Sequence, residues 1–147
     1  MAEAAEARIA RIAVCGAGWW SQGWHLPHLS RRRDARIVAI VESMAFPRSA
    51  INELEPLAAL GERYGAPTFS SVDELFESGV EVDGLLVCTT HASHYEIGVR
   101  GLRAGCHVLM EKPMTVDVAE ARLLAAEARG SARTFMVNNT ANWRAQC

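Results

Sequence analysis

Two groups of polar residues stand where predicted buried strands end, and ligands of open α/β sheets bind at such strand ends. The first group begins at the last residue of the apolar run at residues 84–89 and continues after it; it comprises Thr89, Thr90, His91, Ser93 and His94. The second follows the run at residues 107–110 and comprises Glu111, Lys112 and Pro113. A lone strand-end histidine is commonly a capping or solvent-facing residue. His, Glu and Lys together at two strand ends instead indicate a cofactor or substrate role.

A glycine turn follows the first apolar run, residues 9–15, and the other elements are arranged around it. In Gly16-Ala17-Gly18, Gly16 is expected to make the tight turn. Gly18 has no Cβ and would let a pyrophosphate approach the backbone. The turn therefore predicts a dinucleotide site, with an ordinary turn as the alternative.

A helix is expected to start directly after this turn. The amides of Trp19 and Trp20 would be free donors at its N-terminus, where aligned peptide dipoles favour an anion. The third glycine of the full fingerprint is replaced by Ser21, which approximates close helix-to-strand packing at some steric cost.

An acidic residue ends the second predicted strand, residues 36–41. This residue, Glu42, follows Gly18 at close to the expected spacing of about 20 positions. A carboxylate there accepts both adenosine-ribose hydroxyls and repels a 2′-phosphate, so NAD is favoured over NADP. Arg48 lies nearby in the sequence and leaves NADP as the alternative cofactor. For Glu42 itself, the alternative is a solvated carboxylate at a strand end without a binding role.

The whole chain alternates strand and helix patterns. Further strands are expected at residues 68–69, 84–89, 107–110 and 134–137, and helices at residues 53–64, 71–79, 95–104 and 116–129. Short connections between such elements give right-handed crossovers, so we expect an α/β fold, a doubly wound parallel (Rossmann) sheet of six strands with helices on both faces. The expected organisation is a tail at 1–8, a dinucleotide-binding domain at 9–138 and a short remnant at 139–147.

Composition narrows the class of protein. With 147 residues, half of them hydrophobic, and a net charge of −2, the chain reads as one soluble domain without a nucleic-acid or membrane partner. The arginines at residues 31–33 fit a solvated helix end.

The four cysteines form no C-x-x-C pair, which favours structural thiols over disulfides or a metal site. Without a signal peptide, a cytoplasmic location is expected; a homo-oligomer stays open.

Three segments carry a family resemblance: the glycine turn, residues 89–94, and above all residues 104–113, AGCHVLMEKP. Together they resemble the amino-terminal domain of the Gfo/Idh/MocA oxidoreductases, which include glucose-fructose oxidoreductase and inositol dehydrogenase. The sequence departs from the family pattern at Ser21, at Thr90, where proline is usual, and at Cys106, where lysine is usual.

The resemblance implies a site for NAD, with NADP open, and a small hydroxylated substrate such as a sugar or polyol. The cofactor-binding residues it implies, together with the spacing arguments, are Gly16, Ala17, Gly18, Trp19, Trp20, Glu42, Thr89, His91, His94, Glu111, Lys112 and Pro113. Lys112 is the implied catalytic residue, because an ammonium stabilises negative charge on a reacting oxygen or relays its proton; a plain surface lysine is the alternative. Pro113 is implied to follow a cis peptide, and His94 to face either the cofactor or the helix packing.

The family also carries a second α+β domain that holds the substrate pocket and a base, and we expect that domain to be absent from these 147 residues. Two functions follow. The chain is part of an oxidoreductase, or it is a truncated, catalytically incompetent nucleotide-binding or regulatory module. In either case an apolar surface is expected near the sixth strand, with Val137 and Trp143 as candidates.

Overall fold

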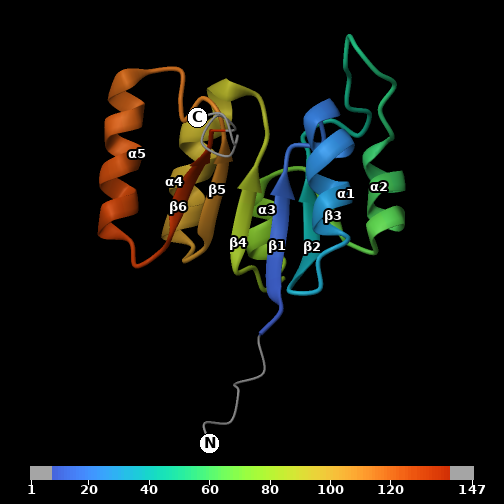
Figure 1. The fold of residues 1–147 in the computed structure, drawn as a ribbon, viewed down its shortest axis with the longest axis horizontal. Helices are drawn as coiled ribbons and strands as arrows, with labels where there is room; N and C mark the ends of the chain where they lie inside the picture. The colour runs from blue at the N-terminus through green and yellow to red at the C-terminus, as the bar shows by residue number, and fades with distance from the viewer. Residues whose placement is uncertain (1–7, 140–147) are drawn as a thin grey trace, which may run out of the picture.

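The structure, a computed structural model, describes residues 8–139 as one α/β layer arrangement (Figure 1). The strands are β1 (Ala10–Cys15), β2 (Ala35–Val41), β3 (Thr68–Phe69), β4 (Gly84–Val87), β5 (His107–Glu111) and β6 (Phe135–Asn138). The helical elements are η1 (Ser21–His25), α1 (Leu26–Leu29), α2 (Leu57–Tyr64), α3 (Val72–Glu77), η2 (His91–Ser93), α4 (His94–Arg103) and α5 (Val118–Gly130).

The six strands form one parallel sheet in the order β3-β2-β1-β4-β5-β6. Chain order reverses between β1 and β4, so the glycine turn after β1 lies at the topological switch point, where such sheets bind their ligands. The register brings the carboxyl ends together, since Cys15 lies opposite both Val41 and Val87, and Glu111 opposite Asn138. The expected six-stranded doubly wound fold is confirmed.

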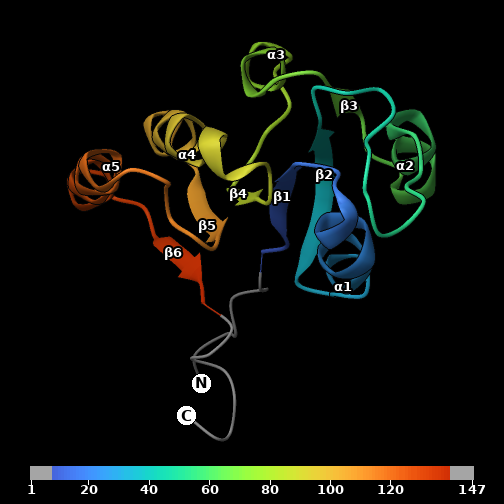
Figure 2. The same cartoon turned by 90° about the horizontal axis from the view of Figure 1, so that it is seen from above.

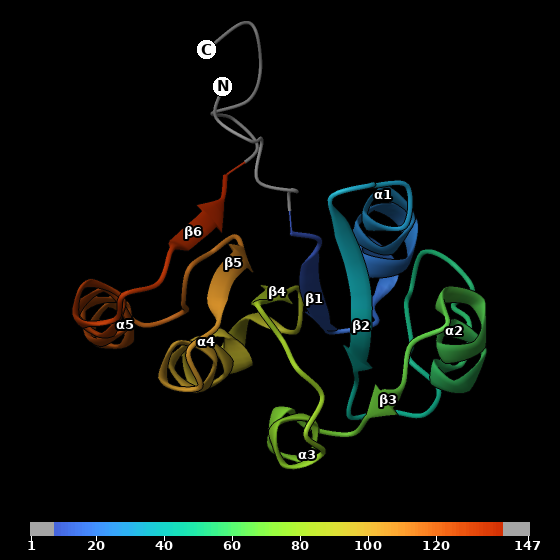
Figure 3. The same ribbon diagram turned by 90° about the horizontal axis from the view of Figure 1, so that it is seen from below.

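Helices cover both faces of the sheet (Figures 2 and 3). On one face α3, α4 and α5 bury Leu75, Leu102 and Leu124 against the sheet. On the other face α1 and α2 bury Leu26 and Leu60. β4 is buried along its whole length, as a central parallel strand with helices on both sides must be.

Helix boundaries differ from the sequence prediction by one or two residues in α3, α4 and α5 and by four residues at the start of α2. The helix expected from residue 53 begins at Leu57, because Pro56 takes an extended conformation and Gln22 holds the backbone of Glu55 in the preceding loop. The helix expected to end at residue 129 ends one residue later. Gly130 is the final residue of α5, and the backbone amide of Ser131 makes the closing bond to the carbonyl of Glu127.

Large apolar side chains are exposed at one end of the sheet, namely Val116, Val118, Leu123 and Met136. They belong to α5, the segment before it, and β6, which is the region where an apolar surface was expected. Val137 is half-buried. Trp143 lies outside the described residues.

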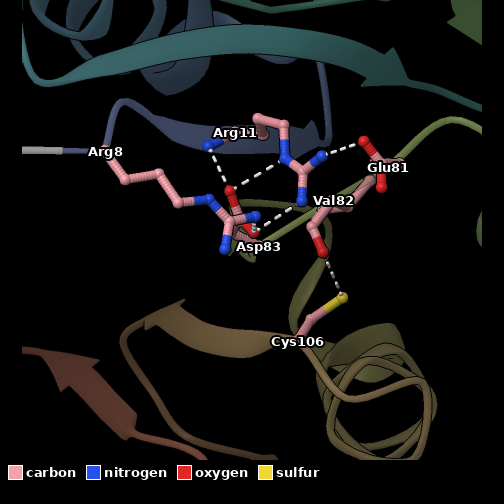
Figure 4. Close-up of polar contacts among 6 residues, drawn as sticks. All are labelled: Arg8, Arg11, Glu81, Val82, Asp83 and Cys106. Atoms are coloured by element: carbon pink, nitrogen blue, oxygen red, sulfur yellow. Dashed lines mark hydrogen bonds and ion pairs between the residues drawn. The ribbon is translucent and has the colours of Figure 1, made fainter.

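An ion-pair network lies at the amino-terminal ends of the central strands β1 and β4 (Figure 4). Asp83 accepts from the backbone amide of Arg11 at 2.9 Å and from its guanidinium at 2.9 and 3.0 Å, and Arg8 donates to it at 2.7 Å. Arg11 also pairs with Glu81. The hydrogen bond from the Arg11 side chain, opposed by partial burial, holds the pKa of Asp83 well below its ordinary value. The network ties the start of β1 to the start of β4.

We expect Asp83→Asn to lower the free energy of unfolding by about 1–3 kcal/mol at neutral pH, because it removes charge-assisted bonds to a half-buried guanidinium. A carboxyl group with a lowered native pKa stabilises the fold above its unfolded pKa of about 4. That contribution declines as the pH falls further. The free energy of unfolding, measured with urea, should therefore decrease less steeply with falling pH in the variant than in the wild type. Glu81→Gln is the control, since Glu81 is 79% exposed and its pair contributes under about 1 kcal/mol. Equal losses in both variants would contradict this role of Asp83.

Candidate cofactor-binding site

A cavity of about 590 Å³ opens at the carboxyl ends of the central strands. It is lined by Gly16, Gly18, Trp19, Trp20, Glu42, Met44, Pro47, Arg48, Cys88, Thr89, Thr90, His91, Glu111 and Lys112. The structure thus brings the glycine turn, the ends of β2 and β4, and the β5 end together around one space. Of the residues predicted for the site, Ala17, His94 and Pro113 do not line this cavity.

The glycine turn has the conformation that its two glycines allow. Gly16 has φ +97°, and a Cβ there would lie 2.5 Å from the carbonyl oxygen of Cys88, so no other residue fits without moving the backbone. A Cβ at Gly18 would meet no described atom within 4 Å. Gly18 therefore leaves room on the cavity side of the turn, as close approach of a pyrophosphate requires.

The helix after the turn begins with Trp19 and Trp20, whose amides occupy the first turn, where amides have no intrahelical partner. The next residues, Ser21–His25, form a π-helical turn, a feature common at functional sites. Ser21 is fully buried, and its hydroxyl lies beside the Cys88 thiol without reaching hydrogen-bond geometry. Burial raises the pKa of Cys88 to about 12, so this cavity-lining thiol is a structural group.

Glu42 is fixed at the edge of the cavity. Its Oε2 accepts from the amide of Ala17 at 2.9 Å, and its Oε1 accepts from the amide of Met44 at 3.1 Å and the hydroxyl of Ser43 at 3.3 Å. The carboxylate therefore connects the glycine turn with the loop after β2. Arg48 lines the same cavity, so a cation and an anion both face the place where the ribose is expected.

The Glu111 carboxylate is the most heavily hydrogen-bonded group of the site. Its Oε1 accepts from Trp20 Nε1 at 2.9 Å, from His25 Nε2 at 2.7 Å and from Asn138 Nδ2 at 2.7 Å. Burial raises the pKa of this carboxyl group, but the three hydrogen bonds outweigh burial and lower the pKa below its ordinary value. Sequence reasoning missed His25 and Asn138, which carry no motif of their own.

Lys112 is exposed and lines the cavity next to Glu111. Its backbone amide donates to Glu111 Oε2 at 3.2 Å, and the peptide bond to Pro113 is cis, as expected. Lys112 is the only lysine in the chain, where all other strongly basic side chains are arginines. The lysine ammonium is a compact point charge with three donors, whereas a guanidinium is planar and delocalised.

The two histidines after β4 lie in different environments. His91 is exposed and lines the cavity. His94 is fully buried, with Nδ1 2.8 Å from the carbonyl of Pro113 and Nε2 3.3 Å from the carbonyl of Thr89. His94 therefore fastens the two strand-end loops to each other, which is the packing position that the sequence left open.

Two departures from the family pattern cost the backbone little. Thr90 has φ −63°, the value that proline would impose. Cys106 is buried, and its thiol donates to the carbonyl of Val82 at 3.6 Å (Figure 4).

Between residues 8 and 139 no group of three or more His, Cys, Asp or Glu side chains is arranged to hold a metal ion. No helix in that range is long and apolar enough to cross a bilayer.

A parallel sheet with a glycine turn at its switch point and an acidic residue ending β2 defines a dinucleotide-binding α/β domain. The model of the family described as "Oxidoreductase family, NAD-binding Rossmann fold" matches residues 10–139. The chain therefore belongs to the Gfo/Idh/MocA oxidoreductase family, of which it represents the NAD-binding domain.

Individual relatives agree with this assignment. The chain is 31% identical to D-glucoside 3-dehydrogenase of Escherichia coli over 81% of its own length and 31% of the relative's. It is 35% identical to galactose 1-dehydrogenase of Pseudomonas fluorescens over 83% and 35% of the two lengths. A 3-ketoreductase from Actinomadura kijaniata, solved in complex with NADP, has a TM-score of 0.78 at 28% identity, covering 93% of this chain and 41% of that one. The chain thus spans about a third of the length of these curated relatives.

Proposed function

We propose that this chain is the cofactor-binding part of an NAD(P)-dependent oxidoreductase that moves a hydride to or from a hydroxyl-bearing carbon of a sugar, a polyol or a similar substrate. The observation that carries the proposal is that the glycine turn and Lys112 line one cavity at the switch point. The named activities of the two curated relatives, on a glucoside and on galactose, support the substrate class.

The residues fit a dinucleotide. Gly18 leaves the backbone open to a pyrophosphate, and the first helical amides after it, with the helix dipole, favour the negative charge. Glu42 would accept the adenosine-ribose hydroxyls, and Thr89 and His91 line the cavity between the turn and the β5 end. When bound, the nicotinamide ring supplies the hydride acceptor or donor.

Lys112 is the proposed catalytic residue. Oxidation of an alcohol removes a hydride from carbon and a proton from the hydroxyl oxygen. An ammonium beside that oxygen stabilises the developing negative charge, or relays the proton once the amine is neutral. The buried Glu111 carboxylate holds the Lys112 amide and keeps a negative charge near the lysine. The cavity wall thus carries the proposed cofactor-binding residues together with Lys112, a group that can stabilise or transfer the proton of the substrate hydroxyl.

NAD is the preferred cofactor in this proposal, because the fixed Glu42 carboxylate repels a 2′-phosphate. We expect Glu42→Gln to weaken NAD⁺ binding by about 10-fold and to strengthen NADP⁺ binding, since Gln keeps an acceptor for the Ala17 amide but loses the charge. Calorimetric titrations with both dinucleotides measure this change. Arg48→Ala is the companion variant and should weaken NADP⁺ more than NAD⁺. Unchanged affinities for both dinucleotides in Glu42→Gln would show that Glu42 does not contact the ribose.

A further inference from the structure

One carboxylate joins three elements that are far apart in the sequence. Glu111, at the end of β5, accepts from Trp20 and His25, in the helix after the glycine turn, and from Asn138, at the end of β6. Asn138 lies directly opposite Glu111 in the strand register. The helical segment after the glycine turn, β5 and β6 therefore meet at a single buried side chain.

The two oxygens of this carboxylate have different partners. Oε1 takes all three side-chain donors, and Oε2 takes the backbone amide of Lys112. A carboxylate group is planar, so donors that fix the direction of one oxygen also fix the other. Charge-assisted bonds of 2.7–2.9 Å are the strong members of their class. The position of the Lys112 amide, and with it the direction in which the lysine leaves the backbone, then depends on the donors at Oε1.

Trp20 has two contacts that connect the cavity with this carboxylate. Its ring lines the cavity, and its indole N–H donates to Glu111. Trp24, on the same stretch of helix, is the residue to compare with Trp20. Its ring lies 5.6 Å from that of Trp20 between centroids, yet it is 50% exposed and does not line the cavity.

We propose that Trp20 and Asn138 are positioning residues that act through Glu111 to set the place of Lys112. The importance of that place for hydride transfer rests on the function proposed above, whereas the positioning itself is a property of this chain alone. Neither residue is proposed to touch the reacting atoms.

Three variants separate the contacts. Trp20→Phe keeps an aromatic ring at the cavity but removes the N–H donor together with part of the indole ring, a loss that the Trp24→Phe control reproduces. Asn138→Leu removes the amide at similar volume. Glu111→Gln can keep an oxygen toward the three donors but then turns an NH₂ group against the Lys112 amide, which breaks that bond. Trp24→Phe is the matched control, because it makes the same chemical change to the neighbouring exposed indole.

The sole lysine provides a direct readout. Reductive methylation with ¹³C-formaldehyde labels Lys112 and the α-amine alone, and the two signals are separated by comparison with a Lys112→Arg sample. In the unliganded protein we expect the Lys112 signal to differ from its position in urea. Trp20→Phe and Asn138→Leu should each remove at least half of that difference, Glu111→Gln most of it, and Trp24→Phe none, in proteins whose circular dichroism remains native. A merely structural loss would lower the melting temperature without moving this signal.

Two results would overturn the positioning role: a wild-type signal already at the urea position, or signals in Trp20→Phe and Asn138→Leu that coincide with wild type. Adding NAD⁺ to the labelled wild type tests the proposed function separately. A saturable shift of the Lys112 signal supports it, and a signal that NAD⁺ leaves unmoved counts against the cofactor site while the unliganded comparison still decides the positioning role.

Discussion

Lys112→Met is expected to lower the rate of hydride transfer by about 10²–10⁴, the usual range for a group that handles a proton in the transition state. Methionine keeps much of the length and apolar stem of lysine but has no charge and no proton. NAD⁺ affinity should stay within a few-fold of wild type, because the glycine turn and Glu42 carry most of the binding in this account. The loss should therefore appear in kcat.

Turnover is measured by NADH formation with a panel of sugars and inositols, using residues 1–147 and, in parallel, the same chain with any downstream domain of the gene product restored. Positioning a substrate carbon against the nicotinamide contributes roughly 7–11 kcal/mol. The curated relatives have about two thirds of their length outside the matched segment, so we expect residues 1–147 alone to turn over slowly or not at all. Full activity of Lys112→Met in the gene product would remove Lys112 from the mechanism. Turnover by residues 1–147 that disappears in Lys112→Met would instead show a complete site on this domain.

Gly18→Leu is expected to weaken NAD⁺ binding by at least about 100-fold, a cost of roughly 2.7 kcal/mol. The new side chain would occupy the open side of the turn, where the pyrophosphate must approach. It should scarcely affect folding, because a Cβ at Gly18 meets no described atom within 4 Å.

Gly23→Leu is the matched control for this variant. Gly23 lies in η1, in the helical segment that follows the glycine turn, a Cβ there is equally free of described neighbours, and it does not line the cavity. Calorimetry with both variants should show lost binding in one and near-wild-type binding in the other, with similar melting temperatures. Equal affinities would mean that the dinucleotide does not pass over the turn at Gly18.

The fold was predictable because its signals are local. An apolar run without polar alternation marks β4, and Ser71, whose Oγ accepts from the Glu74 amide, stands directly before α3 as an N-cap residue does. The start of α2 was missed, because the contact that holds residue 55 out of a helix comes from Gln22, in another element. A pattern along the chain does not report such a contact.

For the candidate site, the sequence predicted which strand ends would meet. The glycine turn, Glu42, Glu111 and Lys112 follow strands directly, and the register brings them to one cavity. His25 and Asn138 were not found, because their importance arises from the direction of side chains that meet at Glu111 across three elements. His94 shows the converse, since its place beside the motif is explained by two carbonyl contacts in the interior.

Titration of NAD⁺ into the 147-residue chain by calorimetry tests the central claim most directly, since every proposal on catalysis requires the dinucleotide to bind at the glycine turn. We predict one saturable site with a micromolar to millimolar dissociation constant, lost in Gly18→Leu and retained in Gly23→Leu. A folded wild-type chain that shows no saturable heat with either NAD⁺ or NADP⁺ would contradict the account.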